Sequence, residues 1–353
     1  VGLRPGSPKR AAPSAGACYP YEILLAPVDE PVVGVVDLVQ RRIVIDGADR
    51  HRWTGDTDTY TYFLVGRPWL SMRRYGRRGY LYHLLDAGHA LFNLSLTTVG
   101  DAVRQLDSMA YATGYALDRA GALLGVGMIR ADGPSTAQPG WVTQERTTLE
   151  VPVTDLESMI TELVPPPPGP VYVPQLTGVL ADALGRRRSA GAFGRDPGQQ
   201  GLAEAVAEVQ RLCERLVSAF EVPTPRIKVF SRQPDVGIEL PDTVWLARAL
   251  LGQQNLVNAS TFLVIHGEIP DKSQVALSAE AQRALIGAGI AGEIGYLVAA
   301  RAGIAVTGVG GFDPDQWARL CGTTDDVLFL LAFGIETAGE KRDVTSTGGN
   351  HSR

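Results

Sequence analysis

Two apolar helical segments, one on each side of the chain's midpoint, constrain the fold more than any other feature of the sequence. Residues 84–94 and residues 289–298 are apolar on most sides of a helix, which is typical of a helix buried in a core. Ala87-Gly88-His89-x-x-Phe92 aligns with Ala291-Gly292-Glu293-x-x-Tyr296 without a gap. Small residues at such positions let two helix backbones come close. The match suggests a duplicated fold with paired central helices, although Ala-Gly in a buried helix is common by itself.

A run of prolines marks a boundary between two parts of similar size. Residues 164–170 read Val-Pro-Pro-Pro-Pro-Gly-Pro, and consecutive prolines favour an extended polyproline II conformation that cannot continue a helix. We predict a stiff, exposed linker over residues 164–174, between a first half, residues 1–163, and a second half, residues 175–353. A ligand for a proline-binding module is the alternative interpretation of this run.

Segments rich in β-branched residues surround the two apolar helices and predict strands. They lie at residues 32–45, 226–230, 262–265 and 327–331, while residues 204–220 have the spacing of an amphipathic helix. Strands and helices do not alternate strictly, which indicates an α+β protein. We expect mixed sheets flanked by helices, with the two apolar helices paired at the centre.

The composition argues against several classes of partner. Of the 353 residues, 45% are apolar and 20% charged, and the net charge of −5 gives no positive field for nucleic acid or an anionic membrane. The first twenty residues hold no continuous apolar segment typical of a signal peptide, and we find no apolar run of membrane-spanning length. We expect a soluble protein.

Standard catalytic and metal motifs are missing from the sequence. Cys18, Cys213 and Cys321 form no Cys-x-x-Cys pair, and the five histidines show no metal-ligand spacing. These features fit a reducing cytoplasm and no bound metal. There is also no Gly-x-Gly-x-x-Gly after a strand, no P-loop, no His-Glu-x-x-His and no Gly-x-Ser-x-Gly. Without these motifs, the remaining possibility for a functional site is a cofactor that is bound by arginines, hydroxyl groups and backbone amides.

Two basic segments are candidates for holding a phosphate. Arg186-Arg187-Arg188-Ser189 follows the helix-like segment Leu180–Leu184, and guanidinium groups beside a hydroxyl suit a phosphate monoester. A solvated basic turn is the alternative. Lys341 and Arg342 follow the apolar run 328–334 and could complete such a site, or else belong to a disordered basic tail.

Two turns are candidates for close approach to a planar ring. Pro13-Ser14-Ala15-Gly16 is a tight turn of small residues before the predicted strand 21–26, and an ordinary turn is its alternative. The segment Val309-Gly310-Gly311-Phe312 offers backbone amides without Cβ obstruction. Asp313 and Pro314 then predict the start of a helix, with Asp313 as its N-cap.

Together these pieces resemble the nitroreductase-like flavoprotein superfamily. The shared order is Arg-Arg-Ser, an Ala-Gly central helix, Gly-Gly-Phe-Asp and a terminal basic pair. Residues 13–22, Pro-Ser-Ala-Gly-Ala-Cys-Tyr-Pro-Tyr-Glu, and the block from Arg74-Tyr75-Gly76 to His89 further resemble the SagB-type azoline dehydrogenases of thiazole and oxazole peptide pathways. The resemblance includes segments of both halves, and it is weak over residues 100–180 and 195–245.

This resemblance implies an FMN site of a particular kind. In the superfamily FMN lies at a dimer interface, whereas here the complementary parts are divided between the halves. We therefore expect an intramolecular pseudo-dimer with one composite site and one degenerate site; further association of two chains is left open. An arm missing from the first half could lie upstream of Val1. The cofactor-binding residues implied are Pro13, Ser14, Ala15, Gly16, Arg187, Arg188, Ser189, Gln254, Asn255, Val309, Gly310, Gly311, Lys341 and Arg342.

Each group of these residues has an expected role. Arg187, Ser189 and the Lys341–Arg342 pair would hold the phosphate, and the Pro13–Gly16 turn would cross from the first half to the flavin. Amides of Gly310 and Gly311 would face the edge of the ring that receives hydride. Gln254 and Asn255 are candidates for the pyrimidine edge.

The resemblance also suggests the catalytic residues, Tyr75 and Arg74. In the azoline branch a Lys-Tyr pair precedes glycine, but this chain has Arg74-Tyr75. Arginine stays protonated, so Tyr75, acidified by Arg74 and by neighbouring arginines, is the expected base for the azoline Cα proton. A solvated helix face is the alternative for the arginines. His89 is expected to be a satisfied core histidine more often than a site residue.

The expected function is FMN-dependent oxidation of azoline rings to azoles in a ribosomally made peptide. The enzyme would act in the cytoplasm after a partner cyclodehydratase, with oxygen reoxidising the flavin. One alternative is reduction of nitro or quinone compounds with NAD(P)H. Another is a flavin-less scaffold within a peptide-modifying complex.

Overall fold

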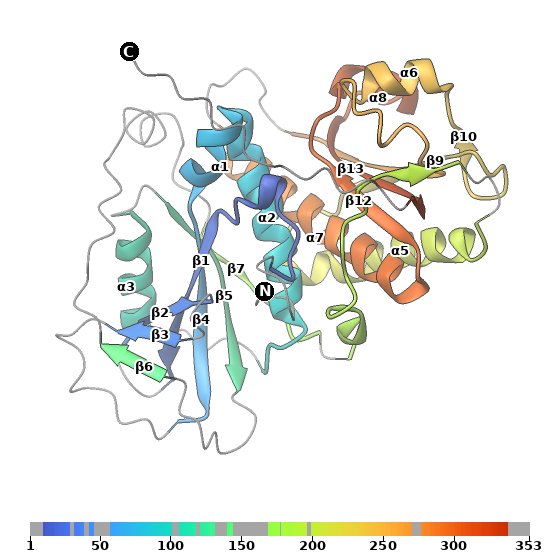
Figure 1. Cartoon of the computed structure of the whole chain (residues 1–353). Coiled ribbons are helices and arrows are strands. Elements are labelled where there is room, and N and C mark those ends of the chain that lie inside the picture. Colours follow the sequence, from blue (N-terminus) through green and yellow to red (C-terminus); the bar gives the residue numbers. More distant parts are fainter. Residues whose placement is uncertain are drawn as a thin grey trace, which may run out of the picture.

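Two mixed sheets lie on either side of a central pair of helices (Figure 1). The computed structural model describes residues 10–28, 32–38, 42–45, 57–100, 106–117, 121–130, 140–143, 169–176, 178–195, 199–269 and 277–337. The α+β prediction is confirmed: each sheet belongs to one half of the chain, and helices pack on both sheets.

The first sheet has the strand order β6-β3-β2-β1-β4-β5-β7. Its strands are β1 (Tyr21–Pro27), β2 (Gly34–Asp37), β3 (Arg42–Ile45), β4 (Thr59–Gly66), β5 (Ala122–Arg130), β6 (Gly140–Thr143) and β7 (Val171–Tyr172). The predicted strand 32–45 therefore contains two strands, which pair antiparallel with each other.

The strand β4 shows why this sheet is buried on both faces. Side chains alternate along a strand, so Tyr62 and Leu64 join the core cluster that contains the central helices. Phe63 and Val65 point the other way and pack in a second cluster with α3 (Leu106–Leu117). The near-continuous apolar run of β4 follows from having a helix on each side.

The second sheet has the order β10-β9-β11-β13-β12, and β8 pairs with the end of β13. Its strands are β8 (Phe193–Gly194), β9 (Arg226–Ser231), β10 (Ile238–Glu239), β11 (Thr261–Gly267), β12 (Ala305–Val309) and β13 (Asp326–Glu336). The accompanying helices are α5 (Leu202–Leu216), α6 (Thr243–Ala249) and α8 (Pro314–Cys321). The Asp313 side chain accepts from the backbone N–H groups of Asp315 and Gln316, so its predicted role as the N-cap of α8 is confirmed.

The central helices α2 (Arg78–Ser95) and α7 (Ala279–Ala302) pack on each other where small residues coincide. A Cβ placed on Gly88 would overlap the Ile286 carbonyl oxygen, and one on Gly289 would overlap the Leu85 carbonyl oxygen. The predicted close approach is therefore present. Its partners are Gly88 and Gly289, whereas Gly292, which the sequence alignment matched to Gly88, faces the His89 ring.

Both halves follow the same order of elements. The first half runs β1, β4, α2, a bridge at Thr98, α3 and β5, and the second runs β9, β11, α7, β12, α8 and β13. The pairings also correspond: β1 with β4 and β4 with β5 are antiparallel, as are β9 with β11 and β11 with β13. The bridge from Thr98 to Ile129 of β5 occupies the place of β12 beside β13. The fold is thus duplicated within one chain.

Two predicted segments take a more specific form. Leu180–Leu184 forms only a single 3₁₀ turn, η3 (Ala181–Ala183), because Leu180 itself adopts a left-handed conformation at φ +59°. Within the predicted linker 164–174, residues 164–168 lie outside the described residues, and Val171–Tyr172 forms β7 on the edge of the first sheet.

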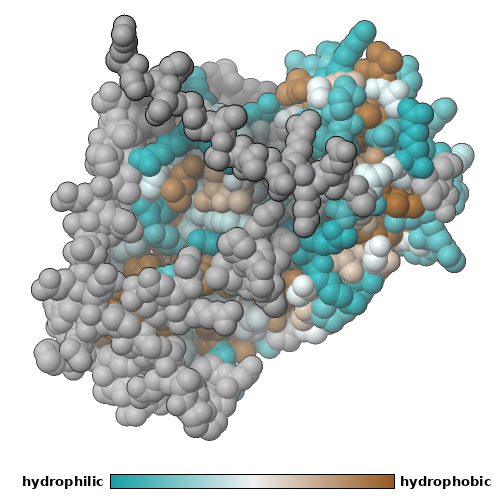
Figure 2. Space-filling model, in the orientation of Figure 1, coloured by the Kyte–Doolittle hydropathy of each residue, from teal (hydrophilic) through white to brown (hydrophobic). Residues whose placement is uncertain are grey.

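The helix α7 has the length and apolar composition of a membrane span, but 89% of its most apolar window is buried inside the protein. It is therefore the core helix of a globular fold. On the face shown in Figure 2, the described surface of the second half is largely hydrophilic with scattered hydrophobic residues, as is usual for a surface in contact with water.

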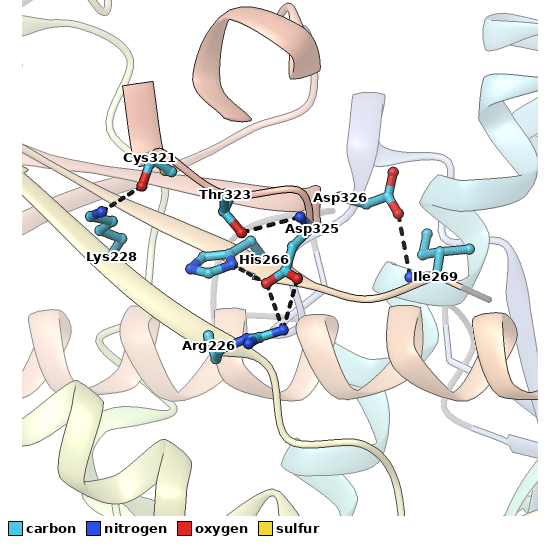
Figure 3. A network of polar contacts seen from close by, with 8 residues as sticks. All are labelled: Arg226, Lys228, His266, Ile269, Cys321, Thr323, Asp325 and Asp326. Carbon is cyan, nitrogen blue, oxygen red and sulfur yellow. Dashed lines mark hydrogen bonds and ion pairs between the residues drawn. The ribbon is translucent and has the colours of Figure 1, made fainter. Parts of the chain in front are cut away.

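A polar network ties strand ends of the second sheet together (Figure 3). The Asp325 carboxylate accepts a hydrogen bond from Arg226 of β9 and lies 2.7 Å from His266 Nδ1 of β11, while the Asp325 backbone N–H donates to Thr323 Oγ1 at 3.1 Å. His266 is thereby engaged in a structural contact. Among the described residues, no group of three His, Cys, Asp or Glu side chains could hold a metal ion.

Candidate functional site

A cavity of about 820 Å³ lies between the two halves, beside α2 and α7. Its volume is in the range of sites for organic cofactors and substrates. The first half contributes Ala12, Pro13, Ser14, Ala15, Gly16, Ala17, Tyr19, Tyr75, Arg78, Tyr82, Leu85, Asp86 and His89. The second half contributes Arg187, Ser189, Gln253, Tyr296, Thr307, Gly308, Gly310, Gly311 and Phe329. The cavity thus brings together the Pro13–Gly16 turn, the basic arm and the glycine-rich loop.

Of the three consecutive arginines of the arm, only Arg187 lines this cavity. It is 1% exposed, its Nε donates to the Ala11 carbonyl oxygen, and its guanidinium carbon lies 5.0 Å from the ring centroid of Tyr296. Its Nη1 is buried and has no hydrogen-bond partner within the described protein. An unpaired charged donor is costly to bury, so Arg187 is set up to receive an anionic group.

Arg188 points elsewhere. Its side chain pairs with Glu336 and is 65% exposed, and it lines a separate depression of about 350 Å³ at the end of α7. Arg186 likewise forms an exposed pair with Asp182, at 2.7 Å. Arg186 and Arg188 thus face away from the cavity, while Arg187 between them faces it.

Ser189 reaches the cavity together with Tyr296, a residue that the sequence singled out only as part of the helix repeat. The two hydroxyl oxygens lie 3.2 Å apart. The Tyr296 hydroxyl also accepts from the Gly308 backbone N–H at 2.5 Å. In the sequence, the one indication that Tyr296 takes part in the site was its phenol hydroxyl on a largely apolar helix.

The Pro13–Gly16 turn is fastened to α2 by Asp86. Ser14 Oγ donates to Asp86 Oδ2 at 2.6 Å and accepts from the Tyr19 backbone N–H at 2.8 Å. The Ala15 backbone N–H donates to Asp86 Oδ1 at 3.3 Å. Gly16 takes φ +58°, and a Cβ there would overlap the Tyr75 hydroxyl. Small residues are therefore required in this turn for it to reach the cavity.

The carbonyl groups of the glycine-rich loop are held from outside the loop. Tyr82 donates its hydroxyl hydrogen to the Gly310 carbonyl oxygen at 2.5 Å, and Gln253 Nε2 donates to the Gly311 carbonyl oxygen. Arg78 Nη2 donates to the Phe312 carbonyl oxygen at 3.0 Å. Within the described part of the chain, the backbone N–H groups of Gly310 and Gly311 have no acceptor. Both glycines line the cavity, so both N–H groups are available to a ligand.

Besides Arg188, three of the predicted cofactor residues do not line the cavity. Val309 is 1% exposed in the core of the second half. Gln254 lines a shallow depression beside α6, and the Asn255 side chain donates to the Gly191 carbonyl oxygen at 2.8 Å. The neighbouring Gln253 is the amide side chain that reaches the cavity. Lys341 and Arg342 lie outside the described residues.

The expected acidification of Tyr75 is wrong. Burial raises the pKa of the Tyr75 phenol, and this effect outweighs the lowering effect of Arg74. Arg74 is exposed and donates to the Gly16 carbonyl oxygen at 2.9 Å. The charge of an exposed guanidinium is screened by water, while the phenol is partly desolvated. Tyr75 therefore lines the cavity as a neutral hydrogen-bonding group at neutral pH.

His89 is buried, as expected, and also lines the cavity. Its Nδ1 lies 3.3 Å from Glu293 Oε2 of α7, and Glu293 is fully buried. The aligned positions of the helix repeat therefore face each other as a polar pair that spans the two halves.

The second half matches a known family. Residues 192–335 match the model of the Nitroreductase family. This part of the chain is similar to nitroreductase-family domains. It contains α7, the glycine-rich loop and all strands of the second sheet.

One solved structure shows the nitroreductase-like fold over most of the chain. A putative nitroreductase from Anabaena variabilis is 16% identical with a TM-score of 0.55, and the match covers 93% of this chain and 82% of that one. A putative nitroreductase, ydfN, from Bacillus subtilis matches 48% of this chain and 97% of its own at 18% identity and a TM-score of 0.35. No curated protein sequence matches significantly.

Proposed function

We propose that the protein is an FMN-dependent oxidoreductase with one composite site, and that it oxidises azoline rings to azoles in a ribosomally synthesised peptide. The observation that carries this proposal is the composition of the cavity. Ser14 and Tyr75 come from the first half, while Arg187 and the two glycine amides come from the second half. Neither half contains all of these groups.

The cavity residues fit a flavin mononucleotide. Arg187 offers a buried, unpartnered Nη1 to a phosphate, and Ser189 offers a hydroxyl beside it. The free N–H groups of Gly310 and Gly311 suit an electron-rich ring edge. Bound FMN would supply two-electron chemistry by accepting a hydride.

The expectation of a single site is supported by a second cavity, of about 520 Å³, beside the corresponding elements of the second half. It is bordered by the Pro223–Pro225 turn before β9 and by Glu280 and Ala284 of α7. Its described lining residues all come from the second half, and they include two carboxylates, Glu268 and Glu280, and one cation, Arg226, which is paired with Asp325. Acidic side chains disfavour a phosphate, so we infer one flavin per chain.

The azoline substrate is supported by the position, at the cavity, of the two segments that resemble azoline dehydrogenases. Residues 13–22 and 74–89 carry the resemblance to azoline dehydrogenases, and most of the first-half cavity residues fall within these two segments. Between them they present Tyr75, Arg78 and Tyr82 to the cavity. Tyr75 and Tyr82 stack edge to face, with ring centroids 5.0 Å apart, and form an apolar wall with polar tips. A small heterocycle held in a peptide suits such a wall.

The residues would act on the substrate by orientation and by polarisation. Tyr75 and Tyr82 keep their protons at neutral pH, because burial raises the pKa of each phenol. Tyr75 can therefore donate a hydrogen bond to a ring heteroatom or a peptide carbonyl, whereas the Tyr82 hydroxyl hydrogen is committed to the Gly310 carbonyl oxygen. Neither phenol accepts a proton. Arg78 is held by the Phe312 carbonyl oxygen and ring. Its positive charge lines the cavity and suits a carbonyl or carboxylate group of the substrate.

The test begins with flavin content. Purified protein should carry about one FMN per chain by absorbance and quantified release, and should oxidise a synthetic thiazoline peptide to the thiazole with a mass loss of two hydrogens. Two FMN per chain would contradict the single site. Flavin-bound protein that oxidises no thiazoline or oxazoline peptide, presented alone or with a cyclodehydratase of the same pathway, would contradict the substrate.

Reduction of nitro or quinone compounds with NAD(P)H is the second candidate, favoured by the match to the Nitroreductase family itself. It predicts rapid bleaching of the flavin by NADH or NADPH without any peptide. Protein without flavin would point instead to the scaffold role.

A further inference from the structure

Asp86 is the only carboxylic acid among the described residues that line the cavity. It lies near the middle of α2 and is 4% exposed. Its carboxyl group sits under the Pro13–Gly16 turn, which by resemblance meets the flavin, and one helical turn before His89. The sequence left this position unassigned, between Leu85 and Ala87.

The orientation of the Asp86 carboxyl group is fixed by the turn above it. Ser14 Oγ accepts from the Tyr19 backbone N–H, so its own hydrogen is committed to Asp86 Oδ2 at 2.6 Å. Asp86 Oδ1 accepts a longer bond, 3.3 Å, from the Ala15 backbone N–H. Each carboxylate oxygen has more than one acceptor site, so both retain capacity for a proton from the cavity.

Asp86 forms no ion pair with any described residue. The titratable groups that face it are Cys18, Tyr19 and Tyr21 before and within β1, Tyr75 of α1 and His89 of α2. Arg187 lines the same cavity from the second half. Burial raises the pKa of Asp86 to about 7, against the lowering effects of Ser14, His89 and the Ala15 amide.

The tyrosine and arginine side chains around the cavity are poor proton acceptors at neutral pH. Burial raises the pKa of the Tyr19, Tyr75 and Tyr82 phenols, and arginine stays protonated. His89 is engaged through Nδ1 with Glu293. A group that accepts a proton works best when it titrates near the working pH, and Asp86 is placed to do so.

We propose that Asp86 is the catalytic base of the site, held in position by Ser14 and the Ala15 amide. This role rests on the proposed azoline oxidation. In that reaction the Cα–H bond of the azoline breaks and its proton forms an O–H bond with the Asp86 carboxylate. The hydride on the neighbouring carbon leaves with its two electrons, and bound flavin would supply the acceptor for it. A C=C bond forms between the two carbons, and the proton later leaves to water when the flavin is reoxidised by oxygen or another acceptor.

The first experiment follows the ionisation of Asp86 without turnover. Infrared difference spectra of flavin-free protein between about pH 8 and pH 5.5 should show a protonated-carboxyl band that titrates near neutral pH. The band should be missing in Asp86→Asn and present in Asp235→Asn, whose carboxyl group is exposed and outside the cavity. An unchanged band in Asp86→Asn would overturn the assignment.

The second experiment measures oxidation of a synthetic thiazoline peptide against pH. Asp86→Asn should still bind FMN but lose about 100-fold or more in kcat, together with the acid limb of the pH profile. Tyr75→Phe should retain that acid limb, whatever its rate. Oxidation by Asp86→Asn within about threefold of the unchanged protein, with its acid limb intact, would overturn the role of Asp86.

Two further variants cover the case in which Asp86→Asn fails to fold. Ser14→Ala keeps the carboxyl group but releases it, so kcat should fall while the acid limb remains and shifts. Asp86→Glu should restore part of the rate, and equal loss in both variants without an acid limb would overturn the proposal. A flavin-bound protein that oxidises no azoline peptide would contradict the proposed function. Full activity in a variant without the Asp86 carboxyl group would contradict only the role of Asp86 as the base.

Discussion

The hydroxyl of Tyr82 donates to the carbonyl oxygen of Gly310 over 2.5 Å, and this bond joins the central helix of the first half to the glycine-rich loop of the second. The two residues are 228 positions apart. With the Gly310 carbonyl held by Tyr82, its peptide plane is constrained, and so is the wall of the cavity that carries the Gly310 and Gly311 N–H groups.

Replacing Tyr82 with Phe should loosen this wall and weaken FMN binding. A single intramolecular hydrogen bond contributes about 0.5–1.5 kcal/mol net, so we expect an increase of about 2- to 10-fold in the FMN dissociation constant. Flavin fluorescence titration measures it. Tyr60→Phe is the control, because the Tyr60 hydroxyl bonds to Thr57 at the far end of β4. Equal effects in the two variants would mean that the Gly310 contact does not hold the wall.

Replacing Arg187 with Ala should reduce FMN affinity far more than replacing Arg188. Arg187 is buried with an unpartnered Nη1 at the cavity, and hydrogen bonds to charged groups contribute about 1.5–3 kcal/mol. We expect about 10- to 100-fold weaker FMN binding for Arg187→Ala, measured by equilibrium dialysis. Arg188→Ala should change it by less than about threefold, because its exposed pair with Glu336 is largely solvated. A larger loss for Arg188→Ala would place the phosphate in the other depression.

Replacing Gly289 with Ala should destabilise the whole protein. The new Cβ would overlap the Leu85 carbonyl oxygen on the facing helix, where backbone atoms cannot move aside cheaply. Overpacking of this kind costs about 1–3 kcal/mol or more, which chemical denaturation would detect as a lower midpoint. Gly114→Ala on the exposed face of α3 is the control, since nothing lies within 4 Å of its Cβ. That change should be neutral or stabilise by up to about 1 kcal/mol. A stable Gly289→Ala variant would show that the helices can separate without loss.

Asp86 should make folding stability depend on pH in an unusual direction. Its pKa is raised from 3.8 to about 7 in the folded protein, so between these values the folded state binds more protons than the unfolded state. Stability therefore falls as pH rises from about 4 to about 7, and the full penalty is present above that range. Asp86→Asn should remove this penalty, an upper limit of about 4 kcal/mol.

The measurement compares free energies of unfolding for the unchanged protein and Asp86→Asn at about pH 5 and pH 8. The variant should gain relative stability at the higher pH. A difference between the two proteins that does not vary with pH would show that Asp86 titrates at its ordinary value.

Local chemistry was enough to predict several features. The apolar spacing of residues 84–94 and 289–298 predicted the two central helices, because a helix without a polar face must be buried. Asp313 before Pro314 predicted the start of α8, because capping depends on residues only two or three positions apart. The nitroreductase-like fold was implied by a family resemblance in the order of the basic arm, the small-residue helix and the glycine-rich loop, and not by local chemistry.

Tertiary packing decided what each residue faces. Neighbours such as Arg187 and Arg188, or Gln253 and Gln254, differ in direction because irregular backbone has no periodicity from which to predict a side. The pKa of Tyr75 is raised and not lowered, because burial depends on the surrounding elements whereas the arginine sequence shows only charge. The sequence by itself identified three segments that contribute to the site, namely the Pro13–Gly16 turn, the basic arm and the glycine-rich loop. The crossing of α2 and α7 at Gly88 and Gly289 decided which of their residues meet, because contacts between distant segments depend on how the helices pack.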